Sequence, residues 1–211
     1  MTPLGQFAAP AGHAASRHFV TDRCRYQLSA DDLVARAADA VRAGVDVIQV
    51  RERDLPDGRL AALVGRIVGV AAGTRTMVMV NDRADVAIAA GAAGVHLRGD
   101  SVPASRVRAV APDGFVIGRS VHSLADVDAA IAGGGCDYLL FGTVFPSAGK
   151  PDGHPVAGLT ALQAACAHSS LPIIAIGGIN EDNAARVREA GAAGFAAVGL
   201  FMGVTPLSGM A

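Results

Sequence analysis

The chain has 211 residues, of which 51% are hydrophobic and 18% are charged. Its 18 basic and 19 acidic residues give a net charge of −1. This balance argues against a nucleic-acid partner or an anionic membrane partner, because binding to either needs a basic excess. No apolar run approaches the roughly 18 residues that span a bilayer. One domain with a buried sheet is therefore expected, since an α/β barrel fits into about 200 residues.

The N-terminal residues indicate where the domain begins, and the cysteines indicate the redox compartment. Residues 1–18 are rich in Ala, Pro and Gly and lack the basic and apolar segments of a signal peptide, which predicts a flexible arm. A single domain is then expected over residues 19–211. The cysteines at positions 24, 136 and 166 are far apart and form no zinc pattern, so reduced thiols in a cytoplasmic protein are expected.

In chain order, a short apolar strand and an amphipathic helix alternate. Eight strands are expected at residues 18–22, 43–51, 76–82, 90–98, 113–120, 132–142, 171–178 and 190–199. Helical periodicity predicts helices near residues 29–44, 57–72, 84–90, 104–111, 123–132, 158–168 and 181–190. The strands are almost continuously apolar, which is typical of parallel strands buried on both faces.

Alternating strands and helices need parallel right-handed crossovers, so the sheet is either open and doubly wound or closed into a barrel. The first strand is not followed by G-x-G-x-x-G, the phosphate-binding signature of the doubly wound dinucleotide fold. Eight strands in about 180 residues favour the α/β class and a (β/α)8 TIM barrel. The segment after the eighth strand lacks a helical pattern, which leaves the final helix in doubt.

Polar side chains follow most of the apolar runs. The functional face of a TIM barrel lies at the C-terminal ends of its strands, so these residues are expected around one mouth. A ring of cations and carboxylates there suggests an anionic substrate bound partly through a metal. The ring comprises Thr21, Asp22, Gln49, Arg51, Arg53, Asn81, Asp82, His96, Arg98, Asp100, Arg119, Ser120, His122, Thr143, Ser147 and Lys150.

Two parts of this ring suggest phosphate and metal binding. Gln49, Arg51 and Arg53 alternate along one strand and suit a phosphate or diphosphate; alternatively, the arginines pair with Glu52 and Asp54. Two further residues, Asp82 and Asp100, end neighbouring strands. With waters and phosphate oxygens they would make a Mg²⁺ site, although Asp at a strand end also caps helices.

The later strands add a lysine and three glycines. Lys150 is the only lysine, and it lies in a glycine-rich loop typical of substrate closure, although a solvated side chain is the alternative. Gly177, Gly178 and Gly199 follow strands seven and eight, where barrels bind phosphate through backbone N–H groups; tight turns are the alternative.

Of the six histidines, His96 belongs to the polar ring and His122 is the candidate for acid–base chemistry. His122 could serve as an acid or base near neutral pH, cap the next helix, or donate a structural hydrogen bond. His13, His18 and His168 are expected to be peripheral, and no partner is predicted for His154.

Six ordered motifs carry a resemblance to a known family. IQVRER, VNDRAD, GVHLRGDSVP, GRSVHS, CDYLLFGTVFPSAGKP and PIIAIGGIN resemble the thiamine phosphate synthase/TenI family over about residues 19–200. The resemblance implies a (β/α)8 barrel and thiamine biosynthesis. Its synthase branch joins a hydroxymethylpyrimidine diphosphate to a thiazole phosphate and releases diphosphate with Mg²⁺. Its TenI branch implies either a thiazole tautomerase using His122 or a catalytically silent ligand-binding or regulatory barrel.

The synthase branch also implies a role for each matching residue. Asp82, Asp100 and Lys150 are retained together, which favours this branch, whereas Arg98-Gly99 stands where synthases usually have Gly-Gln. Small phosphorylated substrates are the implied partners, with homodimer formation left open. By resemblance, Gln49, Arg51 and Arg53 face the pyrimidine diphosphate, Asn81 holds the pyrimidine, Asp82 and Asp100 bind the metal, Ser120 and Lys150 bind the leaving diphosphate, and Gly177, Gly178 and Gly199 hold the thiazole phosphate. Ser147, which keeps one hydroxyl of the lysine loop, is a further substrate-binding candidate.

Overall fold

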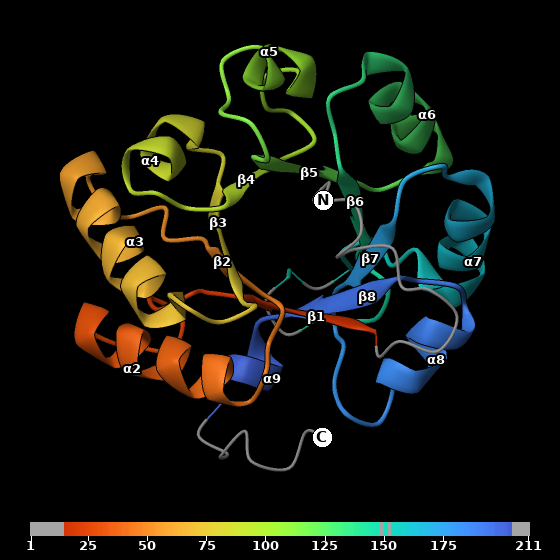
Figure 1. The fold of residues 1–211 in the computed structure, drawn as a ribbon. Helices are drawn as coiled ribbons and strands as arrows, with labels where there is room; N and C mark the ends of the chain where they lie inside the picture. The colour runs from red at the N-terminus through yellow and green to blue at the C-terminus, as the bar shows by residue number, and fades with distance from the viewer. Residues whose placement is uncertain (1–14, 148–149, 152, 204–211) are drawn as a thin grey trace.

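Eight parallel strands close into a barrel in chain order, each hydrogen-bonded to the next and the last to the first. The structure is a computed structural model that describes residues 15–147, 150–151 and 153–203. Figure 1 shows the barrel ringed by helices. The strands are β1 (Ser16–Val20), β2 (Val47–Val50), β3 (Met77–Asn81), β4 (Gly94–Leu97), β5 (Val116–Val121), β6 (Tyr138–Gly142), β7 (Ile173–Ile176) and β8 (Gly194–Ala197). The TIM barrel predicted from the sequence is confirmed.

A helix follows each of the eight strands in the described chain. The helices are α2 (Ala30–Arg42), α3 (Asp57–Ala71), α4 (Ala84–Ala89), α5 (Ala104–Arg108), α6 (Leu124–Gly133), α7 (Gly158–His168), α8 (Ala184–Glu189) and α9 (Gly199–Met202). The final helix, left in doubt by the sequence, is therefore present as the short α9. Four residues are too few to give a helical period, which explains why no pattern indicated it.

The first strand begins earlier than the sequence predicts. It starts at Ser16, whose backbone N–H donates to the carbonyl of Ala193 at 3.0 Å. Residues 16–18 of the predicted arm therefore belong to the barrel, and residues 1–14 lie outside the described part. The other predicted strands include their preceding turns: Gly44, for example, has a φ of +72° and precedes β2.

Local signals explain how the helices form and where they pack. Ser29 caps α2, with its hydroxyl accepting from the N–H of Asp32 while the Asp32 carboxylate accepts from the Ser29 N–H. Leu33, Ala37 and Ala40 then face the barrel and are fully buried. Burying a leucine side chain contributes about 2 kcal/mol, so this apolar stripe fixes the helix against the sheet.

Alternate side chains of each strand point into the barrel or out toward the helices. The inner apolar cluster includes Val47, Met79 and Tyr138, while Phe19 and Ile48 belong to the outer cluster. His18 lies in the barrel interior with 1% exposure and contacts the Ser16 hydroxyl at 3.0 Å, so the expectation that it is peripheral is wrong. Its position in the strand, alternating with Phe19, directs it inward.

Two surface findings complete the fold. His168 pairs with Asp128 on the outside of the barrel, as expected for a peripheral histidine. Within the described residues, every helix is too short or too polar to cross a lipid bilayer.

Candidate functional site

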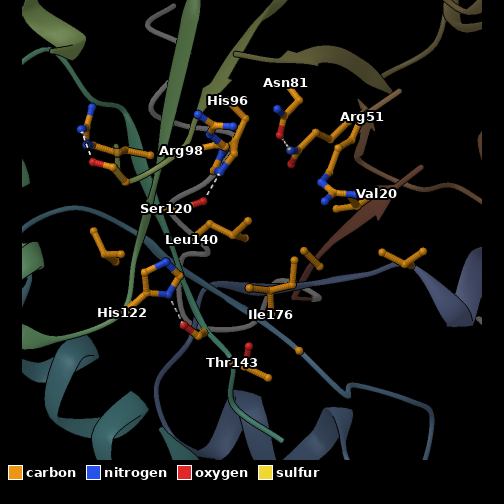
Figure 2. A pocket seen from close by; sticks show the side chains of 18 of the residues that line it. Val20, Arg51, Asn81, His96, Arg98, Ser120, His122, Leu140, Thr143 and Ile176 are labelled. Atoms are coloured by element: carbon orange, nitrogen blue, oxygen red, sulfur yellow. Dashed lines mark hydrogen bonds between the residues drawn. The ribbon is translucent and has the colours of Figure 1, made fainter. Parts of the chain in front are cut away.

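A cavity of about 1260 Å³ opens at the C-terminal end of the barrel strands. Figure 2 shows Arg51, Asn81, His96 and Arg98 on one side of it and His122 and Thr143 on the other. Among the described residues, two members of the predicted polar ring, Thr21 and Asp82, are absent from the cavity lining. The predicted site residues that line the cavity are Gln49, Arg51, Arg53, Asn81, Asp100, Ser120, His122, Ser147, Lys150, Gly177, Gly178 and Gly199.

The end of β2 contributes an amide and two arginines to the cavity. Gln49 is buried and its side-chain NH₂ donates to Oδ1 of Asn81 at 3.1 Å, which fixes both amides. A guanidinium nitrogen of Arg51 lies 3.5 Å from Oδ2 of Asp22. The Gln49 amide and the Arg51 guanidinium are therefore held at the cavity in a defined orientation.

Glu52 and Asp54 do not pair with these arginines. Instead Arg23 holds both carboxylates: its backbone N–H donates to Glu52 and its guanidinium pairs with Asp54. Burial raises the pKa of Glu52, which also accepts from the Thr21 hydroxyl at 2.6 Å. Thr21 in turn accepts from the backbone N–H of Arg51, so this buried group anchors the loop that presents Arg51.

Asp82 and Asp100 converge on a single guanidinium. Nε of Arg98 lies 2.9 Å from Oδ2 of Asp82 and 2.9 Å from Oδ1 of Asp100. The other Asp82 oxygen accepts from the Arg98 backbone N–H at 3.0 Å and from the Ser101 hydroxyl. Arg98 and Ser101 thus occupy the oxygens of Asp82, which explains why this carboxylate does not reach the cavity surface.

These two carboxylates fit Mg²⁺ as a partial ligand set. Carboxylate oxygens are the ligands that Mg²⁺ prefers, and the ion usually keeps waters and substrate phosphates in the remaining positions. The shared contact with one cation shows that the two side chains converge. In the described part of the chain, no group of three His, Cys, Asp or Glu side chains is arranged to hold a metal. The protein alone would therefore supply an incomplete shell.

A buried polar chain runs beneath the cavity from Tyr138 through His96 to Ser120. The hydroxyl of Tyr138 lies 3.0 Å from Nδ1 of His96, and Nε2 of His96 lies 2.9 Å from the Ser120 hydroxyl, as Figure 2 shows for the latter pair. Burial lowers the pKa of His96 to about 4, so the ring is neutral. The space for Tyr138 exists because Gly118 has no Cβ, which would overlap the phenol ring.

The sequence did not identify the Tyr138–His96 pair. His96 counts only as one member of the polar ring in the sequence, because its contacts depend on strands that are distant in the chain. The one available signal is the alternation of β4 and β6, which directs His96 and Tyr138 to the barrel interior.

His122 follows β5 and faces the cavity. Nδ1 lies 2.5 Å from the carbonyl oxygen of Gly142, which can only accept, so this nitrogen carries the proton and Nε2 is left as the acceptor. The following helix α6 is capped by Ser123, whose hydroxyl accepts from the N–H of Asp126 at 3.1 Å. The helix-cap alternative for His122 is therefore wrong.

The glycines after β7 and β8 lie opposite the arginines of β2. Gly177 and Gly178 have φ angles of +104° and +64°, and a Cβ on either would overlap the segment after β6. Gly199 opens α9, whose first N–H groups have no acceptor within the helix. Gly177 and Gly178 therefore form a tight turn, as the alternative interpretation expects, and they also line the cavity.

The loop after β6 brings the lysine to the cavity. Lys150 is exposed, and its backbone N–H donates to the carbonyl of Ser147 at 3.0 Å. Farther along the chain, Nε2 of His154 lies 3.3 Å from the hydroxyl of Thr143, a partner that the sequence does not predict. The exposure of Lys150 agrees with the alternative of a solvated loop side chain. That alternative does not account for the fact that Lys150 also lines the cavity.

A closed parallel barrel with a cavity at the C-terminal ends of its strands has the architecture of the TIM-barrel enzymes. Residues 18–201 match the family model described as thiamine monophosphate synthase, and the chain belongs to this TMP-TENI family. Its relatives identify it as a homologue of thiamine-phosphate synthases, which are transferases of thiamine biosynthesis.

Individual relatives support the same assignment. A thiamine-phosphate synthase of Methanoculleus marisnigri is 42% identical over 164 residues, covering 78% of this chain and 77% of the relative. One from Anaeromyxobacter dehalogenans is 40% identical, covering 82% and 77%. The solved thiamine phosphate pyrophosphorylase of Pyrococcus furiosus superposes with a TM-score of 0.80 at 31% identity, covering 92% of this chain and 90% of the other. The predicted family is confirmed.

Proposed function

We propose that the chain joins hydroxymethylpyrimidine diphosphate to thiazole phosphate and releases inorganic diphosphate in a Mg²⁺-dependent reaction. The observation that carries the proposal is the division of one cavity into two anion-binding sides. Arg51, Arg53 and Arg98 line the cavity after β2 and β4, while Gly178 and Gly199 line it after β7 and β8, so the barrel order places the two sets on different arcs of the mouth. Two phosphorylated substrates need two such sides facing one reaction space.

The centre of the cavity suits flat rings. Val20, Leu140 and Ile176 form an apolar surface between the two sides, as Figure 2 shows. The Gln49–Asn81 amide pair at its edge offers donors and acceptors for a pyrimidine. Both rings could therefore stack over apolar side chains while their phosphates extend to opposite sides, which brings the reacting atoms together.

The residues divide the chemistry as follows in this proposal. The C–O bond between the pyrimidine methylene and the diphosphate breaks, and the thiazole nitrogen forms the new C–N bond to that methylene carbon. Arg51, Ser120, Ser147 and Lys150 stabilise the departing diphosphate by charge and hydrogen bonds. Asp82 and Asp100 would hold the Mg²⁺, which supplies positive charge to the same leaving group when bound.

Ser120 is oriented for this role by the chain beneath it. When Nε2–H of neutral His96 donates to Oγ, the serine O–H is free to donate into the cavity. In that tautomer Nδ1 accepts from the Tyr138 hydroxyl. The buried pair would then position Ser120 as a donor to an anion.

The test is an assay with purified folded protein, both phosphorylated substrates and Mg²⁺, with thiamine phosphate as the product measured. The expected result is Mg²⁺-dependent product, and Asp100→Asn should lower its rate of formation by about 10²–10³, whereas the exposed Asp113→Asn should leave it unchanged. Thiazole phosphate binding without any turnover would support the silent or regulatory alternative instead.

A thiazole tautomerase is the second candidate, favoured by the acceptor Nε2 of His122. This nitrogen could take a proton from the thiazole, with Nδ1 fixed by Gly142. Tautomerisation needs one substrate and no metal, so EDTA and His122→Asn separate the two reactions. Activity that survives EDTA and is lost in His122→Asn would indicate the tautomerase.

The proposal extends to compartment and assembly. Cys24, Cys136 and Cys166 are all free thiols, which supports a reducing compartment such as the cytoplasm. Homodimer formation is left open, and sedimentation analysis of the purified chain would decide it.

A further inference from the structure

Arg98 stands where the metal of the proposed function would bind. Its guanidinium contacts both Asp82 and Asp100, and no other acid in the described part of the chain forms an ion pair with it. The Arg98 side chain is 44% exposed, and it also lines the cavity. It can therefore exchange its carboxylate partners for an anion that enters the cavity.

The backbone around Arg98 is held separately from its side chain. The guanidinium of Arg119 donates to the carbonyl oxygens of Gly99 at 2.7 Å and Val102 at 3.0 Å, which braces the loop after β4. The N–H of Arg98 is tied to Asp82. Because the loop is braced at several points, rotation of the Arg98 side chain is enough to release Asp100 and Oδ2 of Asp82, while Oδ1 of Asp82 keeps its contacts with the Arg98 N–H and the Ser101 hydroxyl.

We propose that Arg98 is a resident counter-cation that keeps the divalent metal out until diphosphate draws its guanidinium away from Asp82 and Asp100. The inference rests on the proposed function and adds an order of binding to it. Diphosphate binds first, and the metal binds after Arg98 has moved. While Arg98 is in place, an entering divalent ion meets a like charge at the carboxylates. A diphosphate gives the guanidinium a bidentate partner and gives the metal its missing oxygen ligands.

The first test measures Mn²⁺ affinity directly, from the electron paramagnetic resonance signal of the free ion, without diphosphate. Wild type should bind Mn²⁺ weakly, and Arg98→Gln should bind it at least about tenfold more tightly because the competing charge is gone. Arg98→Lys should show a smaller gain, since an ammonium keeps the charge but lacks the fork that spans both carboxylates. Arg106→Gln, an equal charge change at an exposed residue of α5, should show none.

A second variant locates the gained site. Asp100→Asn added to Arg98→Gln should remove the gain in Mn²⁺ affinity. Thermal unfolding of each variant checks that the barrel is intact. Equal Mn²⁺ affinity of wild type and Arg98→Gln, with both folded, would overturn the inference.

The last experiment measures how inorganic diphosphate changes the Mn²⁺ affinity of the two proteins. After correction for the Mn²⁺–diphosphate complex in protein-free buffer, diphosphate should tighten Mn²⁺ binding to wild type more than to Arg98→Gln. An equal effect on both proteins counts against the exchange of partners. Absence of Mn²⁺ binding to either protein under any condition would refute the metal role of both carboxylates, while the thiamine phosphate assay tests the proposed reaction separately.

Discussion

The hydroxyl of Tyr138 lies 3.0 Å from Nδ1 of His96 inside the barrel, and no solvent reaches either ring. Burial lowers the pKa of His96 to about 4 and raises the pKa of Tyr138. Both groups are therefore neutral over the working range of most enzymes. Through this pairing, the cavity residue Ser120 on β5 depends on side chains of β4 and β6.

This pairing predicts a loss of stability in acid. In the unfolded chain His96 would titrate near pH 6.5, whereas in the folded barrel it stays neutral down to about pH 4. Between these values the unfolded state binds more protons, so the free energy of unfolding falls as pH falls. The contribution is about 3 kcal/mol, and it is fully present above pH 6.5.

Urea denaturation at several pH values between 4 and 7 measures this effect. His96→Gln should show a shallower dependence on pH, whatever its stability at pH 7. The exposed His168→Gln serves as the matched control and should follow wild type. Parallel curves for wild type and His96→Gln would show that this histidine does not govern acid sensitivity. His18, whose pKa burial lowers to about 3, would continue to contribute in both proteins.

The single lysine allows a chemical test of Lys150. Amine acetylation removes the charge of a lysine, and in this chain it can react only at Lys150 and the α-amino group. Acetylation should abolish thiamine phosphate formation, and inorganic diphosphate should protect both the activity and the residue. Peptide mass mapping follows the modification.

Lys150→Arg is the matched control, because this variant leaves only the α-amino group to react. Whatever activity it retains should be unaffected by the reagent. Fully acetylated wild type that turns over normally would remove Lys150 from the diphosphate site.

The glycine turn predicts a difference between two substitutions by alanine. Gly73 and Gly178 both have positive φ, so each alanine costs about 1 kcal/mol in backbone strain. At Gly178 the new Cβ also overlaps Phe145 and Pro146, whereas at Gly73 it meets open space. Gly178→Ala should therefore lower the melting temperature more and weaken thiazole phosphate binding, and Gly73→Ala should leave binding unchanged. Calorimetry gives both quantities, and normal affinity in a folded Gly178→Ala would exclude the phosphate role.

The sequence predicts the barrel well because its repeated unit is local. Each apolar strand and each helical period is readable within about ten residues, and turns such as Gly44 separate them. The short α9 escapes because a single turn has no period. The cavity is predictable for a related reason: parallel strands of a barrel end on one face, so residues such as Gln49 and Ser120 meet there without any contact being known.

Pairings between side chains are less predictable, because they depend on spatial neighbours. Neighbours in sequence suggested that Glu52 and Asp54 could pair with the β2 arginines, but Arg23, about 30 residues away, takes both. The exposed guanidinium of Arg98 between Asp82 and Asp100 could not be anticipated either, since a charged side chain of this length reaches in many directions. His18 was misjudged although it opened the predicted first strand, because that strand begins at Ser16 and places His18 in its interior.

Asp100→Asn is the substitution that most sharply separates a metal-binding role from a structural one. The Asp100 side chain is 76% exposed and its ion pair with Arg98 is a surface pair, so its loss should change stability by less than about 1 kcal/mol. Synthase turnover should nevertheless fall by about 10²–10³, since stabilising a developing anion is commonly the largest catalytic contribution. Thiazole phosphate affinity should stay at the wild-type value, because Gly178 and Gly199 lie on the other side of the cavity. Turnover, affinity and melting temperature measured on the same preparation, beside Asp113→Asn, decide the matter. A parallel fall of all three would assign Asp100 a structural role and refute its place in the metal site.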